Sequence, residues 1–341
     1  MPSRTFPGGA IATPLRWSRG RQDGQTNQKL PSGTVNGCVS KADKPYKPSL
    51  PRKHLKLKQP KLMMDKMSIY ADGLDHAECV AWHPDGSLWA GGEAGQIYRI
   101  DPDTREPRVV ASTGGFILGI AFSPDCSWML VCDLGQHCLW RLDSQTFELT
   151  LFAKGVEGHD FQIPNFACFD RKGNVYVSES GAFREVNGKI LRFDSTGKGA
   201  IWQDGPFNFA NGMALDAREE YLYIVCSFLP GIERVRILED GSAGDREVFA
   251  TLPETVPDGM AFDADGGLWV SCYAPNKLYR ITPDRQVQLM ADDWEGHTLA
   301  NPTNIAFGGA HFDQLFTANL GRWHLTKIDI GVKGLKLPCH L

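Results

Sequence analysis

Most of this chain consists of short runs in which apolar and polar residues alternate, each ended by a turn rich in Asp, Gly or Pro. Six segments share one form, in which an apolar strand that contains Ala is followed by a turn and a second apolar strand. They are ECVAWHPDGSLWAGG (78–92), LGIAFSPDCSWMLVCD (118–133), NFACFDRKGNVYVSE (165–179), NGMALDAREEYLYIVC (211–226), DGMAFDADGGLWVSC (258–272) and TNIAFGGAHFDQLFTAN (303–319). Such a pattern is typical of half-buried β-strands joined by tight turns.

The six segments recur at a nearly constant interval of 40 to 47 residues. A third strand-like run follows each of them, for example QIYRID and KILRFD, and a fourth such as PRVVAST follows most. Four short strands repeated at this period indicate a β-propeller with one four-stranded antiparallel sheet in each repeat. We therefore predict an all-β protein with a six-bladed propeller over residues 67–335 and a C-terminal tail over 336–341.

The sixth repeat lacks a fourth strand of its own. The segment SIYADG (68–73) resembles the fourth strands of the other repeats but precedes the first repeat. We expect this N-terminal strand to complete the sixth blade, because closing the ring removes the exposed edges that an open sheet would have.

Residues 1–66 differ from the rest of the chain in charge and composition. They contain 14 of the 36 Lys and Arg residues but 3 of the 40 Asp and Glu residues, which leaves 22 basic against 37 acidic residues in 67–341. The segment is rich in Pro, Gly and Ser and has no sustained periodicity, so we predict a disordered extension or a non-native leader. The acidic remainder argues against nucleic acid as a partner.

Neither a membrane segment nor a metal-binding cysteine motif is found in the sequence. No run of 18 apolar residues exists, and the N-terminal segment lacks the continuous apolar stretch of a secretory signal. The nine Cys residues show no zinc-type spacing, and most lie in strand-like runs. We therefore expect a cytoplasmic protein with reduced thiols and no membrane partner. Its oligomeric state stays open.

The residue that opens each repeat has a special place in a propeller. The first strand of every blade lines the central channel, so these six residues meet at one end of the axis. They are Glu78, Leu118, Asn165, Asn211, Asp258 and Thr303. Two enclosed carboxylates repel each other and lose hydration unless a cation compensates them.

We therefore predict a divalent metal ion held by Glu78, Asn165, Asn211 and Asp258. An all-oxygen donor set suits Ca²⁺ first, then Mg²⁺ or Mn²⁺, with Fe²⁺ or Zn²⁺ as further options. The alternative is that the Asn-Gly and Asp-Gly pairs only supply turn residues.

The same residues resemble a known family. Glu78, PN at 164–165, NG at 211–212, PDGM at 257–260 and TNIAFGG at 303–309 are similar to motifs of the senescence-marker-protein/gluconolactonase family, which includes regucalcin. The resemblance covers about 67–330. It implies a six-bladed propeller with one divalent metal on the axis that hydrolyses lactones and some esters. It also implies that the four residues named above are the ligands and that Asp258 is the acid/base group.

The sequence departs from this family at two positions. Members that act on sugar lactones usually have Arg two residues before the first Asn and Asp directly after it, where this chain has Ile163 and Phe166. We therefore expect these two residues to form an apolar side of the substrate site. This departure favours alkyl-substituted or aromatic lactones and aryl esters over sugar lactones.

Further candidates for substrate contact lie at strand ends and in loops on the same face. Asp133 and Glu179 end second strands, where they could orient a ligand or bind substrate, or could simply be solvated. His159 and His297 lie in the loops VEGHDFQ and WEGHTLA, and His76 lies in LDHAE. We expect the first two to contact substrate, although loop histidines are commonly surface residues.

These features favour a metal-dependent lactonase or esterase that acts on a small molecule. A bound ion would polarise the carbonyl, and Asp258 would accept a proton from the attacking water. Serine-hydrolase, nucleotide-binding and nicotinamide-binding fingerprints are missing from the sequence. The alternatives are a non-catalytic propeller that uses its metal for stability and binds a ligand or partner, and a related propeller enzyme with a non-lactone substrate.

Overall fold

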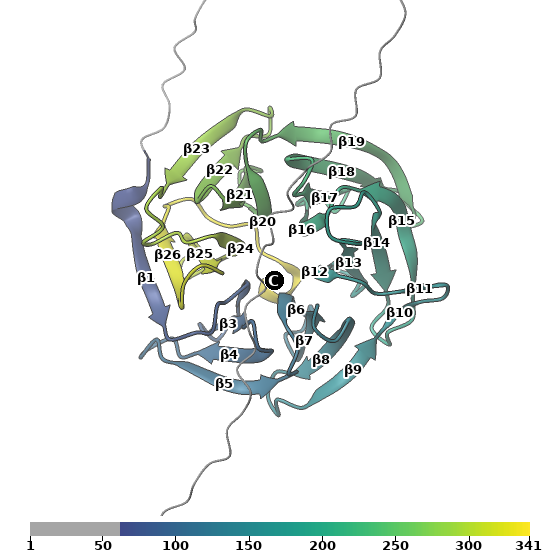
Figure 1. Cartoon of the computed structure of the whole chain (residues 1–341), viewed down its shortest axis with the longest axis horizontal. Coiled ribbons are helices and arrows are strands. Elements are labelled where there is room, and N and C mark those ends of the chain that lie inside the picture. The colour runs from purple at the N-terminus through teal and green to yellow at the C-terminus, as the bar shows by residue number, and fades with distance from the viewer. Residues whose placement is uncertain (1–61) are drawn as a thin grey trace, which may run out of the picture. The chain divides into compact units, whose positions relative to one another are not determined.

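A computed structural model describes residues 62–341, which form six four-stranded antiparallel sheets around a central axis (Figure 1). This arrangement confirms the predicted six-bladed propeller. The described part of the chain also contains one two-stranded hairpin and two helices of three residues each. No helix in this part is long and apolar enough to cross a membrane. The predicted disordered extension lies outside the described residues except for its last five positions.

In blades 1 to 3 the first strand along the chain is innermost and the fourth is outermost (Figure 1). Their strands are β2 (Cys79–Trp82), β3 (Leu88–Gly91), β4 (Gln96–Ile100), β5 (Pro107–Ser112), β6 (Ile117–Phe122), β7 (Trp128–Asp133), β8 (Cys138–Asp143), β9 (Leu149–Ala153), β12 (Pro164–Phe169), β13 (Val175–Glu179), β14 (Gly188–Phe193) and β15 (Gly199–Phe207). The hairpin of β10 (Gly155–Val156) and β11 (His159–Asp160) connects blades 2 and 3.

Blades 4 and 5 repeat this order, and blade 6 is made from both ends of the described chain. The strands are β16 (Ala210–Leu215), β17 (Tyr221–Cys226), β18 (Gly231–Ile237), β19 (Ala243–Thr251), β20 (Val256–Phe262), β21 (Leu268–Ala274), β22 (Lys277–Ile281), β23 (Val287–Asp292), β24 (Pro302–Gly308), β25 (Gln314–Asn319) and β26 (His324–Asp329).

The ring closes through β1 (Met67–Asp72), which pairs antiparallel with β26 from Met67 opposite Ile328 to Asp72 opposite His324. This pairing confirms the predicted closing strand. Just before β1 lies the 3₁₀-helix η1 (Met64–Lys66). Met63 is buried, and its N–H donates to Met290 O at 2.8 Å. The described fold therefore begins a few residues before the predicted boundary at 67.

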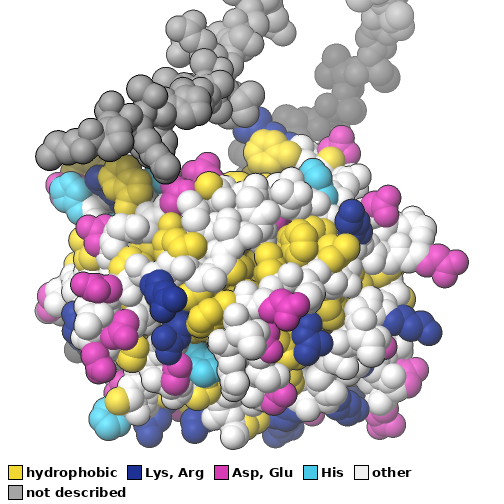
Figure 2. Space-filling model, turned by 90° about the horizontal axis from the view of Figure 1, so that it is seen from below, with side chains coloured by type: hydrophobic (Ala, Val, Ile, Leu, Met, Phe, Trp, Pro, Cys, Tyr) yellow, Lys and Arg dark blue, Asp and Glu magenta, His cyan; other side chains and the backbone are white. Residues whose placement is uncertain are grey.

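The core consists of six apolar clusters, most of which lie between neighbouring blades. Between blades 4 and 5, for example, the ring of Tyr223 packs edge-on against Phe249 and Phe262, with centroids 5.0 Å apart in both pairs. Charged and apolar side chains are mixed on the outer wall near β5 and β9 (Figure 2). Burial in this fold is thus strongest between the sheets, where the alternating pattern places the apolar residues.

Aspartates in the turns after the innermost strands hold several blades together. Asp263 accepts hydrogen bonds from the Gly267 N–H at 2.7 Å and from Trp269 Nε1 at 2.9 Å. It also forms a 2.7 Å ion pair with Arg280 on the third strand of blade 5. In blade 1 the turn residue that pairs with the third strand is Asp85, two positions further along the turn than Asp263 in blade 5, and it lies 2.9 Å from Arg99. An ion pair between a turn aspartate and an Arg of the third strand therefore stabilises both of these blades.

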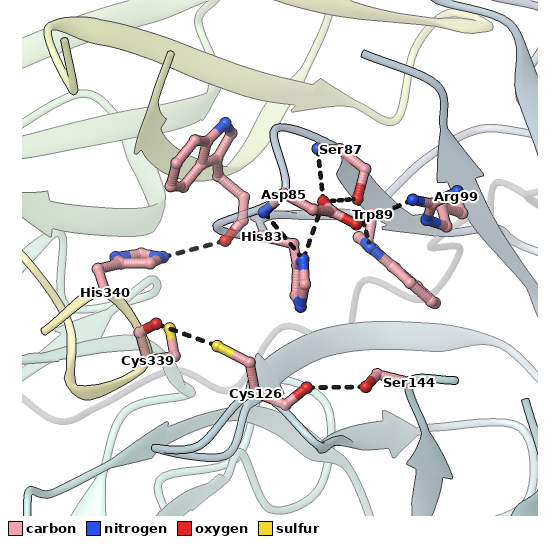
Figure 3. A network of polar contacts seen from close by, with 10 residues as sticks. His83, Asp85, Ser87, Trp89, Arg99, Cys126, Ser144, Cys339 and His340 are labelled. Atoms are coloured by element: carbon pink, nitrogen blue, oxygen red, sulfur yellow. Dashed lines mark hydrogen bonds and ion pairs between the residues drawn. The ribbon is translucent and has the colours of Figure 1, made fainter. Parts of the chain in front are cut away.

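The C-terminal tail crosses one end of the central channel (Figure 1). Its 3₁₀-helix η2 (Pro338–His340) is fixed by Trp82 O, 3.0 Å from His340 Nε2, and by Cys126 Sγ, which donates to Cys339 O at 3.0 Å (Figure 3). Tail residues and the innermost strands line a cavity of about 120 Å³. Because β2 runs from Cys79 to Trp82, the tail lies at the end of the channel away from Glu78.

Candidate functional site

The four predicted ligand residues lie at the channel end opposite the tail, and each is between 4% and 7% exposed. Glu78 directly precedes β2, whereas Asn165, Asn211 and Asp258 lie near the starts of β12, β16 and β20. Four blades thus each direct one polar side chain into a buried part of the channel.

A break in strand pairing accompanies each axial position from blade 2 to blade 6. The register between first and second strands shifts there, as between Ala210 and Met213 and between Pro257 and Met260. In blades 2, 4 and 5 a glycine follows the axial residue and allows the next blade to approach closely. A Cβ at Gly212 would lie 2.6 Å from Asp258 O, so any larger residue would separate the two innermost strands.

Two serines orient the two axial carboxamides. Asn165 Nδ2 donates to Ser180 Oγ at 3.1 Å, and Asn211 Nδ2 donates to Ser227 Oγ at 3.2 Å. The serine hydroxyls in turn donate to backbone carbonyls of the following blade, Ala210 O and Pro257 O. Because the amide nitrogens are used in this way, the Oδ1 atoms are the groups left to bind a ligand.

Four buried oxygens of the described residues have no hydrogen-bond partner in this part of the channel. They are Glu78 Oε2, Asn211 Oδ1, Asp258 Oδ1 and Asn304 Oδ1. Buried polar atoms are nearly always paired, so a group of unpaired acceptors indicates a ligand that is itself positive or a hydrogen-bond donor. Sequence reasoning missed Asn304, which follows the axial Thr303 and donates to Glu78 O and Leu118 O at 3.1 and 3.2 Å.

Burial raises the pKa of both axial carboxyl groups. Burial, and then the charge of Asp258, raise the pKa of Glu78 well above its usual range. Burial raises the pKa of Asp258 to about 7, against the opposing effect of the Asn211 amide. The site thus holds carboxyl groups that are costly to ionise without a compensating cation.

These donors fit a hard divalent cation, because carboxylate and carboxamide oxygens are the ligands that such ions take. Within residues 62–341, no three His, Cys, Asp or Glu side chains are grouped in a way that could hold a metal. A metal at this end of the channel would therefore depend on the two carboxamides as well as on Glu78 and Asp258.

The two carboxylates predicted at strand ends are buried and already hydrogen-bonded. Asp133 accepts from the N–H groups of Phe116 and Gln136 at 3.0 Å and from Trp140 Nε1 at 3.2 Å. Glu179 accepts from the N–H groups of residues 162, 163 and 181 at 2.9 to 3.3 Å. Both side chains therefore fix loops of the axial face, and neither is a solvated strand end.

The two residues predicted to form an apolar side of the substrate site, Ile163 and Phe166, lie on different sides of the four predicted ligand residues. Ile163 precedes Asn165 in the loop that Glu179 holds, so it belongs to the axial face. Phe166 instead packs in the core between blades 3 and 4 and lines the cavity nearer the tail. Its side chain is thus directed away from the end where a ligand of Glu78 and Asp258 would lie.

The loop histidines differ in their surroundings. His159 lies on β11, and its Nε2 is buried without a partner. His297 is strongly exposed and lies 3.3 Å from Glu295. His76 Nδ1 lies 2.7 Å from Leu320 O, and its ring packs edge-on against Trp323. Of the two histidines predicted to contact substrate, His159 is the more buried one.

Tyr273 is a further residue of the axial face that sequence reasoning missed. Burial raises the pKa of its hydroxyl, and the charges of Glu78 and Asp258 raise it further. Tyr273 lies on β21, two residues after Ser271. The signal in the sequence would have been strand alternation, because residues two apart on β21, such as Ser271 and Tyr273, lie on the same side of the strand.

Known proteins are similar to this chain over most of its length. Residues 76–319 match the family model described as SMP-30/Gluconolactonase/LRE-like region. Pentonolactonase XacC of Haloferax volcanii is 26% identical over 250 residues, which cover 70% of this chain and 80% of that protein. The 6-deoxy-6-sulfogluconolactonase of Pseudomonas putida is 25% identical over 258 residues, with 70% and 81% covered.

Two other similarities are shorter or weaker in sequence. An uncharacterized protein of Sulfolobus acidocaldarius is 35% identical over 117 residues, which are 32% of this chain and 41% of that protein. The solved gluconolactonase of Xanthomonas campestris superposes with a TM-score of 0.66 at 20% identity and covers 77% of this chain and 89% of its own. That likeness shows the shared fold. The family match spans all six axial positions, and the chain belongs to the SMP-30/gluconolactonase/LRE-like family.

Proposed function

We propose that this protein is a metal-dependent hydrolase that opens a lactone or a related ester. The observation that carries the proposal is the group of buried, unpaired oxygens contributed by Glu78, Asn211, Asp258 and Asn304. A divalent cation would compensate these acceptors and the two neighbouring carboxylates together. The names of the two relatives matched over most of this chain, a pentonolactonase and a sulfogluconolactonase, support lactone opening as the reaction.

Glu78, Asn165, Asn211 and Asp258 would hold the ion, with Ca²⁺ as the first candidate because all donors are oxygens. Ser180 and Ser227 keep the carboxamide oxygens turned toward it. When bound, the ion supplies positive charge that polarises the carbonyl of the substrate.

Asp258 would act as the general base. Its pKa of about 7 in the metal-free protein indicates how strongly this buried site favours the protonated carboxyl. In the loaded site the neighbouring positive charge would lower this pKa and leave the carboxylate ionised, so that it could accept a proton from water. The Ser227 hydroxyl donates to Pro257 O, the carbonyl directly before Asp258, and so fixes the backbone from which Asp258 extends.

The test is hydrolysis of γ-butyrolactone, gluconolactone and phenyl acetate by the purified protein, before and after EDTA treatment and after return of Ca²⁺, Mg²⁺, Mn²⁺ or Zn²⁺. We expect activity to be lost with EDTA and restored by at least one ion. Asn211→Ala should lower the affinity for the ion that restores activity. The variant Asp103→Asn, in an exposed turn, is the matched polar control and should keep that affinity. Full activity in the EDTA-treated protein would contradict the proposal.

A further inference from the structure

Three phenylalanines from two neighbouring blades form a cluster on the axial face. Phe209 and Phe228 have ring centroids 4.8 Å apart, and Phe183 packs edge-on against both at 6.0 and 5.5 Å. All three come from loops, between β13 and β14, before β16, and between β17 and β18. We call Phe183, Phe209 and Phe228 the aromatic triad.

The aromatic triad is joined directly to the residues that orient the axial oxygens. Phe209 lies two residues before Asn211, and its carbonyl accepts a hydrogen bond from the Ser227 N–H at 3.2 Å. Phe228 follows Ser227, the residue that holds Asn211 Nδ2. Phe183 lies in the loop that begins with Ser180, the partner of Asn165. The aromatic triad therefore lies at the mouth of the site, beside blades 3 and 4.

This part of the mouth presents apolar side chains to solvent, with the guanidinium of Arg184 over the Phe183 ring, 5.4 Å from its centroid. Phe183 is 60% exposed, and the adjacent Leu229 is 52% exposed. The exposed aliphatic residues of the outer wall, in contrast, come from separate outermost strands, such as Val109 on β5 and Val248 on β19. A grouped apolar surface next to buried polar atoms is the usual composition of a small-molecule site.

We propose that the aromatic triad binds an alkyl or aryl substituent of the lactone or ester whose carbonyl lies at the axial oxygens. This inference rests on the proposed function and adds its substrate class. The substrate carbonyl would lie at the cation that the unpaired acceptors hold. The rest of the substrate must therefore extend outward along the mouth. On the side of blades 3 and 4 it meets the aromatic triad, Leu229 and Ile163, which offer no hydrogen bonds to sugar hydroxyls through their side chains.

Phe209 has a positive φ of 62°, a backbone conformation that is uncommon for an aromatic residue. The hydrogen bond from the Ser227 N–H to its carbonyl fixes this conformation. Its ring is thereby held against Phe228 and Phe183 before substrate arrives. A preformed apolar surface of this kind lowers the ordering cost of binding and rewards each added methylene by about fourfold in affinity.

The experiment measures kcat/KM along a series of γ-lactones with increasing alkyl length, from γ-butyrolactone to γ-octanolactone, with the metal-loaded protein. We expect a rise of about fourfold per methylene, carried by KM. In Phe183→Ala the rise in kcat/KM should fall to about twofold or less per methylene. Phe183→Leu should restore part of the rise, and Val248→Ala on the outer wall is the matched control.

Because Phe183 is largely exposed, its replacement is expected to leave the melting temperature unchanged, and this is checked first. Calorimetry with 5-alkyl-2-pyrrolidinones, lactams that resist hydrolysis, gives a readout that does not need turnover. Turnover of γ-butyrolactone or gluconolactone without dependence on alkyl length would overturn the aromatic triad as a subsite and leave the proposed function intact. No turnover of any lactone with any ion would overturn both.

Discussion

Replacing Asp258 by Asn should stabilise the metal-free protein, and increasingly so as the pH rises. In the folded protein the pKa of Asp258 is about 7, against 3.8 for an ordinary aspartate. Folding thus favours the protonated carboxyl. The stabilising effect of protonation is complete below pH 3.8 and is lost as the pH rises through 7.

The size of the effect follows from these two values. Because of its raised pKa, Asp258 lowers the free energy of unfolding by about 4 kcal/mol at pH 8 and by about 2 kcal/mol at pH 5. Asparagine has no such cost, so the stability gained in Asp258→Asn should grow by roughly 2–3 kcal/mol between these pH values. For a domain of this size, that corresponds to about 5 °C in melting temperature.

The assay is thermal unfolding of parent and variant in EDTA at pH 5, 6, 7 and 8. The exposed Asp103→Asn variant serves as the control and should show no such trend. With excess metal the advantage of the variant should shrink, because an ion at 100 times its Kd stabilises the parent by about 2.7 kcal/mol and binds the variant less tightly. A variant-minus-parent difference that does not change with pH in EDTA would refute the reasoning about this buried carboxyl.

Three further predictions concern the fold. Gly259→Ala places a methyl group 2.6 Å from Asn304 Cα, so it should lower the free energy of unfolding by at least about 1–3 kcal/mol in denaturant titrations. An unchanged midpoint would contradict the close approach of blades 5 and 6. Asp263→Ala leaves Arg280 and Trp269 Nε1 unpaired and should cost about 3–5 kcal/mol, measured in the same way. Deleting 1–62 should leave the melting temperature unchanged, whereas deleting through Asp72 removes β1 and should abolish cooperative unfolding, as followed by circular dichroism.

The sequence predicted the architecture because propeller blades repeat a local pattern. Alternation, turn residues and a period of 40 to 47 residues were sufficient for blade number and strand order. The pairing of β1 with β26 was also predicted, since the sixth repeat lacked a fourth strand. The same register argument placed Glu78, Asn165, Asn211 and Asp258 at one channel end, where the structure has them.

What the pattern could not provide was the direction of side chains next to a break in pairing. The shift between Pro164 and Phe166 sends the side chain of Phe166 into the core below Asn165, although the two residues are neighbours. The sequence also left open whether Asp133 and Glu179 were solvated. Their backbone partners come from loops, and loops have no periodicity from which contacts could be predicted.

The aromatic triad escaped prediction for a related reason. Phe183, Phe209 and Phe228 lie in three separate loops, and their contacts depend on how two blades sit side by side. Asn304 was missed because Thr303 occupied the aligned axial position, whereas the unpaired oxygen belongs to the next residue. Substrate preference therefore depends on parts of the chain that the repeat does not describe.

Ring closure by β1 also affects how the chain behaves during its synthesis. About 250 residues separate Asp72 from its partner His324. At a typical rate of 5–20 residues per second, the strand that completes blade 6 leaves the ribosome roughly 12 to 50 seconds before β26 exists. During that time β1 is an unpaired strand on an unfinished chain, and an unpaired strand can pair wrongly with other nascent chains. Two residues of β1, Ser68 and Asp72, are polar and exposed, and polar residues lower the tendency of an unpaired strand to pair with the wrong partner.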